Sequence, residues 1–176
     1  GHNVQALCVD GTFDDCQALV KQAFLDNDLQ KDKRLTSANS INIARLIPQS
    51  FYYIHAWSQL PKGSPAPVFI VPSGNFGNLT AGLMAWKMGL PVSHFIAATN
   101  INDVVPQYLV SGLYEPRASV QTYANAMDVG KPSNFVRMEA IFDYSWKKMK
   151  EAITGYAYTN EEILHIIPKV LDQYGY

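Results

Sequence analysis

Short apolar runs alternate along the chain with longer stretches of helical period. The runs at residues 4–9, 68–71 and 92–98 are each bounded by turn-forming residues, and this pattern is typical of β-strands. Residues 118–122 form a weaker run of the same kind. We therefore expect strands at these four places, with those at 68–71 and 92–98 buried.

Helical periodicity marks most of the remaining chain. Residues 14–27 place apolar side chains on one stripe with aspartates in the first turn, where the helix dipole favours acids. Residues 40–60 are apolar nearly all round, which predicts a helix buried on most sides. A kink is expected at Pro48, because proline removes a backbone donor. Further helices are predicted at residues 79–88, 103–110, 133–142, 144–152 and 160–174.

The order of these elements predicts the fold class. A strand, a helix and a strand follow one another at residues 68–98, within about thirty residues, as in a βαβ unit. Such crossovers join parallel strands. The sequence therefore predicts an α/β fold with an open, mainly parallel sheet and helices on both faces. The polar residues 27–36 are expected to form a surface connection.

Composition and charge exclude several classes of function. The net charge is -1, from 14 basic and 15 acidic residues, so bulk electrostatics favour no nucleic acid. No apolar run reaches the roughly 18 residues of a membrane span. Cys8 and Cys16 lie in apolar surroundings and are interpreted as buried, reduced thiols of a cytoplasmic protein. We expect no metal site, because the histidines and cysteines lack ligand spacing.

The first candidate site is the loop between the strand at 68–71 and the helix that follows. Its sequence, SGNFGN, occupies residues 73–78. In open parallel sheets ligands bind at the carboxyl ends of strands. Glycine and asparagine tolerate positive φ, so that successive N–H groups can turn toward an anion at the helix N-terminus. The loop matches neither GxGxxG nor a Walker A motif, which favours the phosphate of an organic cofactor. A tight turn without a ligand is the alternative.

A second anion signal precedes the helix at residues 40–60. Small polar side chains cluster at residues 37–42, and Arg45 follows within two turns. Serine and asparagine are good N-cap residues, so a well-capped helix with a surface arginine is one interpretation. One cap requires only one such residue, however. The cluster beside an arginine therefore also suits a second phosphate or a carboxylate.

Five segments together resemble the threonine synthases, which are pyridoxal-phosphate (PLP) enzymes of fold type II, the tryptophan synthase β-like architecture. The segments are VDGTFDDCQALVKQAF, TSANSINIARLIPQSFYY, VPSGNFGNLTAG, MGLPVSHFIAATNINDVVP and SVQTYANAMDVGKPSNFVR. The resemblance implies a carbon–oxygen lyase of threonine biosynthesis that converts O-phospho-L-homoserine and water to L-threonine and phosphate. It also implies that residues 1–36 are the tail of a smaller domain, and residues 37–176 the major part of a larger domain.

The resemblance also implies site residues. The cofactor phosphate is expected in a cup whose members are Ser73, Gly74, Asn75, Phe76, Gly77 and Asn78. The substrate is expected at a set made up of Asn39, Ser40, Arg45 and Asn75. A further motif after the second buried strand is expected to anchor loops or edge the active site, through Thr99, Asn100, Asn102 and Asp103.

One departure from the family pattern matters. The ten lysines lack the sequence context of the family's Schiff-base lysine, which we expect upstream of this segment. The chain is accordingly interpreted as a middle-to-late part of a longer enzyme, inactive alone and prone to self-association through exposed sheet edges. Two alternatives remain: another fold type II enzyme resembling threonine dehydratase, and a noncatalytic module that binds a phosphate ligand.

Overall fold

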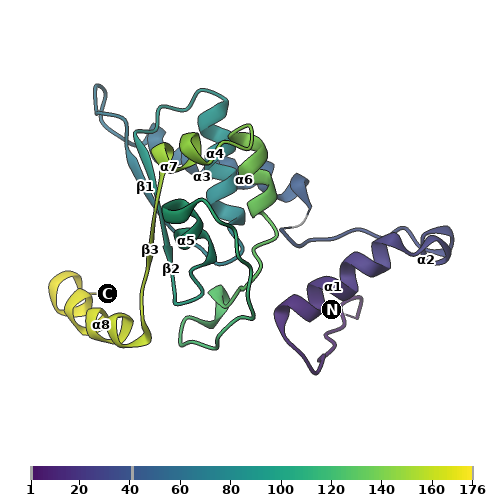
Figure 1. Ribbon diagram of the computed structural model, residues 1–176. Helices are drawn as coiled ribbons and strands as arrows, with labels where there is room; N and C mark the ends of the chain where they lie inside the picture. The colour runs from purple at the N-terminus through teal and green to yellow at the C-terminus, as the bar shows by residue number, and fades with distance from the viewer. Residues whose placement is uncertain (1, 41, 176) are drawn as a thin grey trace. The chain divides into compact units, whose positions relative to one another are not determined.

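The computed structural model describes residues 2–40 and 42–175, and the chain divides into two compact units, Gly1–Ser37 and Ala38–Tyr176 (Figure 1). This boundary lies close to the one expected at residue 36. The assignment of the two parts to a smaller and a larger family domain stays a prediction. No helix in the described ranges is long and apolar enough to cross a membrane.

The first unit is helical. Helix α1 (Phe13–Leu25) confirms the predicted helix and begins with a capping box, in which Thr12 N donates to Asp15 Oδ2 at 2.8 Å. Asp26 caps α2 (Asn27–Asp32), a short helix within the expected connection. The strand predicted at residues 4–9 is wrong: the segment is irregular and exposed, since a lone β-prone run without a partner strand leaves its hydrogen bonds unmade. Cys8 is exposed, contrary to the expected burial, and Cys16 is half-buried.

The second unit contains a sheet of three parallel strands in the order β1-β2-β3 (Figure 1). The strands are β1 (Val68–Pro72), β2 (His94–Thr99) and β3 (Ile153–Ala157). The expected βαβ unit is formed by β1, α4 (Gly77–Lys87) and β2. The predicted α/β class with a parallel sheet is confirmed. The strand β3 was missed, because ITGYA contains a glycine and continues directly from a helix.

In the described part of the chain helices pack on one face of this sheet and on each other, so the expectation of helices on both faces is wrong for this segment. The remaining elements are η1 (Ile43–Arg45), α3 (Leu46–Ser58), α5 (Val104–Ser111), η2 (Asn125–Met127), α6 (Phe135–Ile141), α7 (Trp146–Ala152) and α8 (Asn160–Tyr174). Phe95 of β2 packs beside Gly82 of α4, and Gly155 of β3 lies against Pro106 of α5. Alternation along the strands places Phe95 and Gly155 on the same face. On the opposite face Ile70 is 68% exposed.

Two further expectations about the second unit are corrected. Helix α3 begins at Leu46, so Pro48 occupies its first turn, where a missing N–H leaves no intrahelical bond unmade, and no interior kink arises. The helix is not buried on most sides, since Phe51 and Tyr52 are exposed. Residues 118–122 form no strand; they belong to an irregular segment held by side-chain hydrogen bonds.

Candidate functional site

The predicted phosphate loop lies where expected, at the carboxyl end of β1. Ser73 N donates to Ala98 O at 2.8 Å, which continues the pairing of β1 with β2. The Ser73 hydroxyl turns back and donates to Val71 O at 2.9 Å. The chain then leaves the sheet and enters α4 at Gly77. The sheet therefore fixes the start of the loop, and α4 fixes its end.

The backbone conformation of the loop differs from the expectation for its glycines. Neither Gly74 nor Gly77 has positive φ; Phe76, the N-cap of α4, is left-handed with φ of 60°. Phe76 is buried, which holds this unfavourable conformation in place. Gly74 is required for a different reason: a Cβ there would lie 2.6 Å from Met127 Cα. The glycine allows two stretches of main chain to touch.

A row of main-chain donors follows Ser73. Within the residues that the structure describes, the N–H groups of residues 74–79 donate no hydrogen bond. The last three belong to the first turn of α4, where N–H groups have no intrahelical acceptor and the dipole is positive. Such a row at a strand's exit suits a phosphate. The loop is therefore more than a tight turn closed on itself.

Asn75 joins the two predicted anion sites. Its Nδ2 donates to Ser40 Oγ at 2.7 Å. Its Oδ1 accepts from Ser133 N at 2.6 Å and from Ser133 Oγ at 2.9 Å. The Asn75 carbonyl accepts from Asn134 Nδ2 at 2.9 Å. One amide thus ties together three segments that are far apart in the sequence.

The residues expected to bind the substrate lie beside the loop at residues 73–78. Ser40 Oγ donates to Asn39 Oδ1 at 3.2 Å, and both residues are half-buried. A Cβ at Gly77 would lie 3.1 Å from Ser40 Cβ, so this serine faces the start of α4. The exposed Arg45 folds back, and its Nη1 donates to Ala38 O at 2.8 Å. The predicted members Asn39, Ser40, Arg45 and Asn75 therefore lie close together.

Two neighbouring residues escaped the sequence analysis. Arg137 Nη1 donates to Ser40 O at 3.2 Å and to Asn134 Oδ1 at 2.6 Å, which places a second guanidinium at this site. The Tyr53 hydroxyl lies 3.0 Å from both Asn78 O and Asn78 Oδ1. Burial raises the pKa of Tyr53, so the hydroxyl remains a neutral donor. Arg137 ends the last of the quoted segments, SVQTYANAMDVGKPSNFVR, which was the one available signal.

The motif after β2 anchors a loop. Thr99, Asn100 and Asn102 are all buried. Asn100 Nδ2 donates to Asp128 Oδ1 at 2.7 Å, and Asn102 Oδ1 accepts from Val120 N at 2.7 Å. Asp103 forms an ion pair with Arg117. These contacts agree with the expected role of loop anchors.

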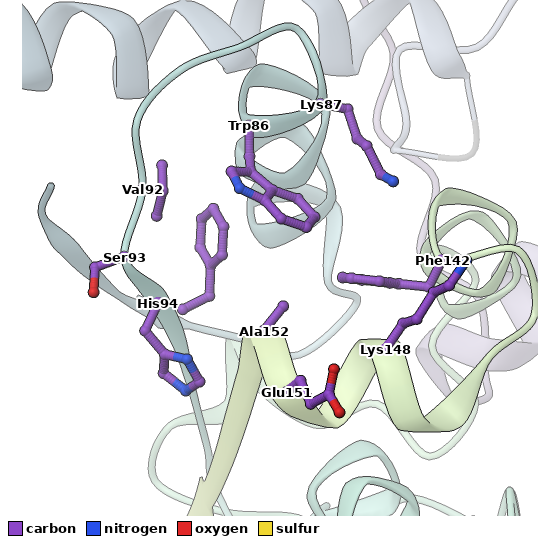
Figure 2. Close-up of a pocket in the computed structure, with 10 residues that line it drawn as sticks. Trp86, Lys87, Val92, Ser93, His94, Phe142, Lys148, Glu151 and Ala152 are labelled. Carbon is purple, nitrogen blue, oxygen red and sulfur yellow. The ribbon is translucent and has the colours of Figure 1, made fainter.

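A separate cavity lies at the opposite edge of the sheet, near the amino ends of β2 and β3. Its volume is about 310 Å³, and Figure 2 shows Trp86, Phe142 and His94 around it. Exposed side chains, Lys87, Lys148 and Glu151, surround these rings. None of the candidate residues lines this cavity. In open parallel sheets ligands bind at the carboxyl edge, so the loop at 73–78 is the candidate site.

Chemically, the candidate site can bind anions but offers no recognised catalytic base. Among the contacts of the described residues, none joins any of the ten lysines to residues 73–78 by a hydrogen bond or ion pair. Within the described ranges, no group of three His, Cys, Asp or Glu side chains could hold a metal ion. The site offers main-chain N–H groups, hydroxyls, amides and two guanidinium groups.

Comparison with known proteins shows what the chain is similar to. No protein-family model matches the chain. A threonine synthase from Serratia marcescens is 49% identical over 177 residues, which cover 100% of this chain and 41% of that protein. The crystal structure of threonine synthase from Escherichia coli matches 100% of the chain, with a TM-score of 0.90 and 46% identity, over 41% of its own length.

The chain is homologous to part of threonine synthase.

A PLP-bound threonine synthase from Brucella melitensis also matches, with a TM-score of 0.82 and 35% identity over 99% of the chain and 43% of that structure. The present chain thus spans about 41% of the length of its curated threonine synthase relatives. The suspected resemblance and fold class are confirmed. The individual binding roles of the candidate residues stay predictions.

The donor set fits PLP. The cofactor has a phosphate dianion, and the N–H groups at residues 74–79 form a row without acceptors in the described chain. At the start of this row the missing Cβ of Gly74 leaves room for the main chain of Met127. A dianion at the N-terminus of an 11-residue helix is favoured by the helix dipole.

Proposed function

We propose that this chain forms the phosphate-binding part of a threonine synthase. The overall reaction converts O-phospho-L-homoserine and water to L-threonine and phosphate, as a lyase acting on a carbon–oxygen bond. The observation that supports this most strongly is the link between two anion sites: the cup at residues 73–78 and the Asn39–Ser40 pair are joined by the 2.7 Å bond from Asn75 to Ser40.

In this proposal the cup holds the cofactor phosphate. The N–H groups of residues 74–79 would hold the phosphate, and the dipole of α4 would stabilise its negative charge. Phe76 and Gly74 shape the main chain for this task, one through its left-handed conformation and one through its missing Cβ. PLP, once bound, supplies an electron sink that stabilises negative charge on the substrate carbon.

The second set holds the substrate phosphate. Ser40 and Asn39 offer a hydroxyl and an amide, and Arg45 and Arg137 bring positive charge to the same place. Charge-assisted hydrogen bonds from guanidinium to phosphate are roughly twice as strong as neutral ones. Asn75 lies between the two anions and fixes their separation. The geometry would then place a phosphorylated side chain beside the cofactor.

The proposal assigns no covalent role to the lysines of this chain. A phosphate cup binds and orients the cofactor but cannot replace a nucleophilic amine. We therefore expect the 176-residue chain alone to bind PLP without turning over O-phospho-L-homoserine. Catalysis requires the lysine that the family provides upstream of the corresponding segment. The cytoplasmic location expected from the cysteines stays a prediction.

Titration of the purified chain with PLP tests this function. We expect saturable binding that inorganic phosphate reverses by competition, and no lysine modified in a 1:1 ratio after borohydride reduction and mass spectrometry. One stoichiometrically modified lysine would refute the interpretation that this chain lacks the Schiff-base lysine and is inactive alone. Absence of any saturable binding would refute the proposal that residues 73–78 bind the cofactor phosphate.

Self-association is a further part of the proposal. In the described part of the chain β1 pairs with β2 alone, so the other edge of β1 offers unpaired backbone groups. Ile70, a residue of β1, is 68% exposed. We expect sedimentation to show concentration-dependent dimers that Ile70→Lys abolishes. A monomer at every concentration would contradict this part.

The two alternatives explain less of the site. A threonine dehydratase-like enzyme has no substrate phosphate, and the Asn39, Ser40 and Arg45 set would then have no anion to bind. A noncatalytic module would retain the cup and would require no second site. Binding of inorganic phosphate at two places, one of them blocked by PLP, would favour the threonine synthase interpretation over both.

A further inference from the structure

The loop at residues 117–130 touches the cup directly. The ideal Cβ position on Gly74 lies 2.6 Å from Met127 Cα and 3.1 Å from Met127 C. The main chain at Met127 therefore forms a wall at the first N–H of the donor row. The loop closes on itself, since Arg117 N donates to Gly130 O at 3.2 Å. Whatever holds this loop therefore also sets one wall of the cup.

A network of side-chain hydrogen bonds holds this loop, whose one short helical turn is η2. Asp128, the residue after Met127, accepts at Oδ1 from Asn100 Nδ2 at 2.7 Å, from Thr122 Oγ1 at 2.8 Å and from Asn102 Nδ2 at 3.2 Å. Its Oδ2 accepts from Thr122 N at 2.9 Å. Asn102 holds the other side of the loop by exchanging two bonds with Val120.

Three members of the network are buried, Asp128 is half-buried, and the network is anchored to the sheet. Asn100 is fully buried and follows β2 directly, and its Nδ2 also donates to Thr122 Oγ1 at 2.9 Å. Asn100 Oδ1 accepts from Asn102 N at 3.0 Å and from Asn102 Nδ2 at 2.9 Å. The half-buried Asp128 carboxylate receives its bonds from donors on the buried residues Asn100, Asn102 and Thr122, and each lost bond would leave a buried donor unpaired. The end of β2 thus positions Met127 through side chains.

We propose that Asn100, Asn102, Thr122 and Asp128 are positioning residues that shape the phosphate cup by holding Met127 against Gly74. This inference rests on the proposed function, since the cup is its target. The four residues touch neither cofactor nor substrate in this account. They act on the cup through the main chain of residue 127.

The test compares two isosteric substitutions in the 176-residue chain. Thr122→Val removes the hydroxyl that bonds Asp128 and Asn100. Thr154→Val, the matched control, removes a hydroxyl that bonds His94 Nε2 at 2.7 Å near the amino edge of the same sheet. The first readout is hydrogen–deuterium exchange, measured without ligand. We expect Thr122→Val to speed exchange both in the loop and at residues 74–79, and Thr154→Val to leave residues 74–79 unchanged.

The second readout is the dissociation constant for PLP, measured beside pyridoxal, which lacks the phosphate. We expect Thr122→Val to weaken the binding of PLP about tenfold and the binding of pyridoxal far less. In the control, Thr154→Val, the affinity for PLP should stay within about twofold of wild type. Asp128→Asn gives a second route to the same result if Thr122→Val does not fold.

The outcomes separate the two proposals. A loosened loop with unchanged exchange at residues 74–79 would overturn the positioning role, as would equal effects of Thr122→Val and Thr154→Val. If the wild-type chain fails to bind PLP, the proposed function fails, while the exchange data still decide whether the network shapes the loop at residues 73–78.

Discussion

The two edges of the same parallel sheet are built differently. At the carboxyl edge, main-chain N–H groups have no acceptor in the described chain, and the half-buried amide of Asn75 holds three segments together. At the amino edge lies the cavity of about 310 Å³, walled by aromatic rings and exposed ionic groups. This cavity contains none of the candidate residues, so a hollow alone does not identify the site. The direction of the strands and the donors without acceptors in the described chain are the basis for proposing an anion site at the carboxyl edge.

The largest expected effect is that of Gly74→Ala at the carboxyl edge. The new Cβ would lie 2.6 Å from Met127 Cα, and overpacking of this kind costs about 1–3 kcal/mol. We expect PLP to bind about a hundredfold more weakly, measured by titration.

Gly155→Ala is the matched control for this change. Its Cβ would lie 2.8 Å from Pro106 Cα, a similar clash within β3 under α5. We expect it to lower the melting temperature while the dissociation constant for PLP changes little. If both variants weakened PLP binding equally, the effect of Gly74→Ala could not be assigned to the phosphate cup.

Asn75→Ala should have the next largest effect. The change removes hydrogen bonds to Ser40 and Ser133 and leaves Ser133 N without its partner. We expect the free energy of unfolding to fall by about 2 kcal/mol in urea titrations, with weaker PLP binding. Asn125→Ala, at an exposed position, should change neither quantity measurably. A stable Asn75 variant with normal PLP affinity would show that the two sites are not joined.

A smaller effect is expected to distinguish the site for the substrate phosphate from the site for the cofactor phosphate. In a complete threonine synthase that contains this segment, Asn39→Ala or Arg45→Ala should raise the KM for O-phospho-L-homoserine about tenfold and leave PLP affinity nearly unchanged, because a charge-assisted hydrogen bond contributes about 1.5–3 kcal/mol. Arg34→Ala, which changes an exposed arginine of the first unit, serves as the control. Equal losses of substrate and cofactor binding would refute the assignment of the second site.

The smallest effect concerns an exposed capping box just beyond β3. Hydrogen bonds from Thr159 N and Oγ1 hold the pKa of Glu162 below its ordinary value of 4.5. The stabilisation of α8 is thus fully present above the ordinary pKa and is lost as pH falls through the lowered pKa. We expect a slight loss of helical circular dichroism in acid, absent in Glu162→Gln. A large change, or a change in PLP affinity at neutral pH, would contradict this purely local role.

Local sequence patterns were sufficient for the βαβ unit. Four apolar residues at 68–71, the helical stretch that ends before Gly89 and the run at 92–98 each predict an element that the structure contains. The candidate loop follows from that order. Residues 4–9 mislead because a strand depends on a partner, which local propensity does not reveal.

The connections within the site depend on distant residues. Asn75 bonds Ser40 and Ser133, which are 35 and 58 positions away, and no periodicity predicts such pairs. The same holds for Arg137, whose Nη1 reaches Ser40 O across 97 positions. The resemblance to threonine synthase predicted Asn39, Ser40 and Arg45 as substrate-binding residues. The fold shows why they lie together.

The most direct test of the account is an NMR titration of the ¹⁵N-labelled chain with PLP, with the amide signals assigned. The account predicts the largest shifts at the amides of residues 74–79, reversed by excess inorganic phosphate. Shifts confined to the amino edge around Trp86 and His94, or amides at 74–79 that remain unchanged at saturation, would contradict it.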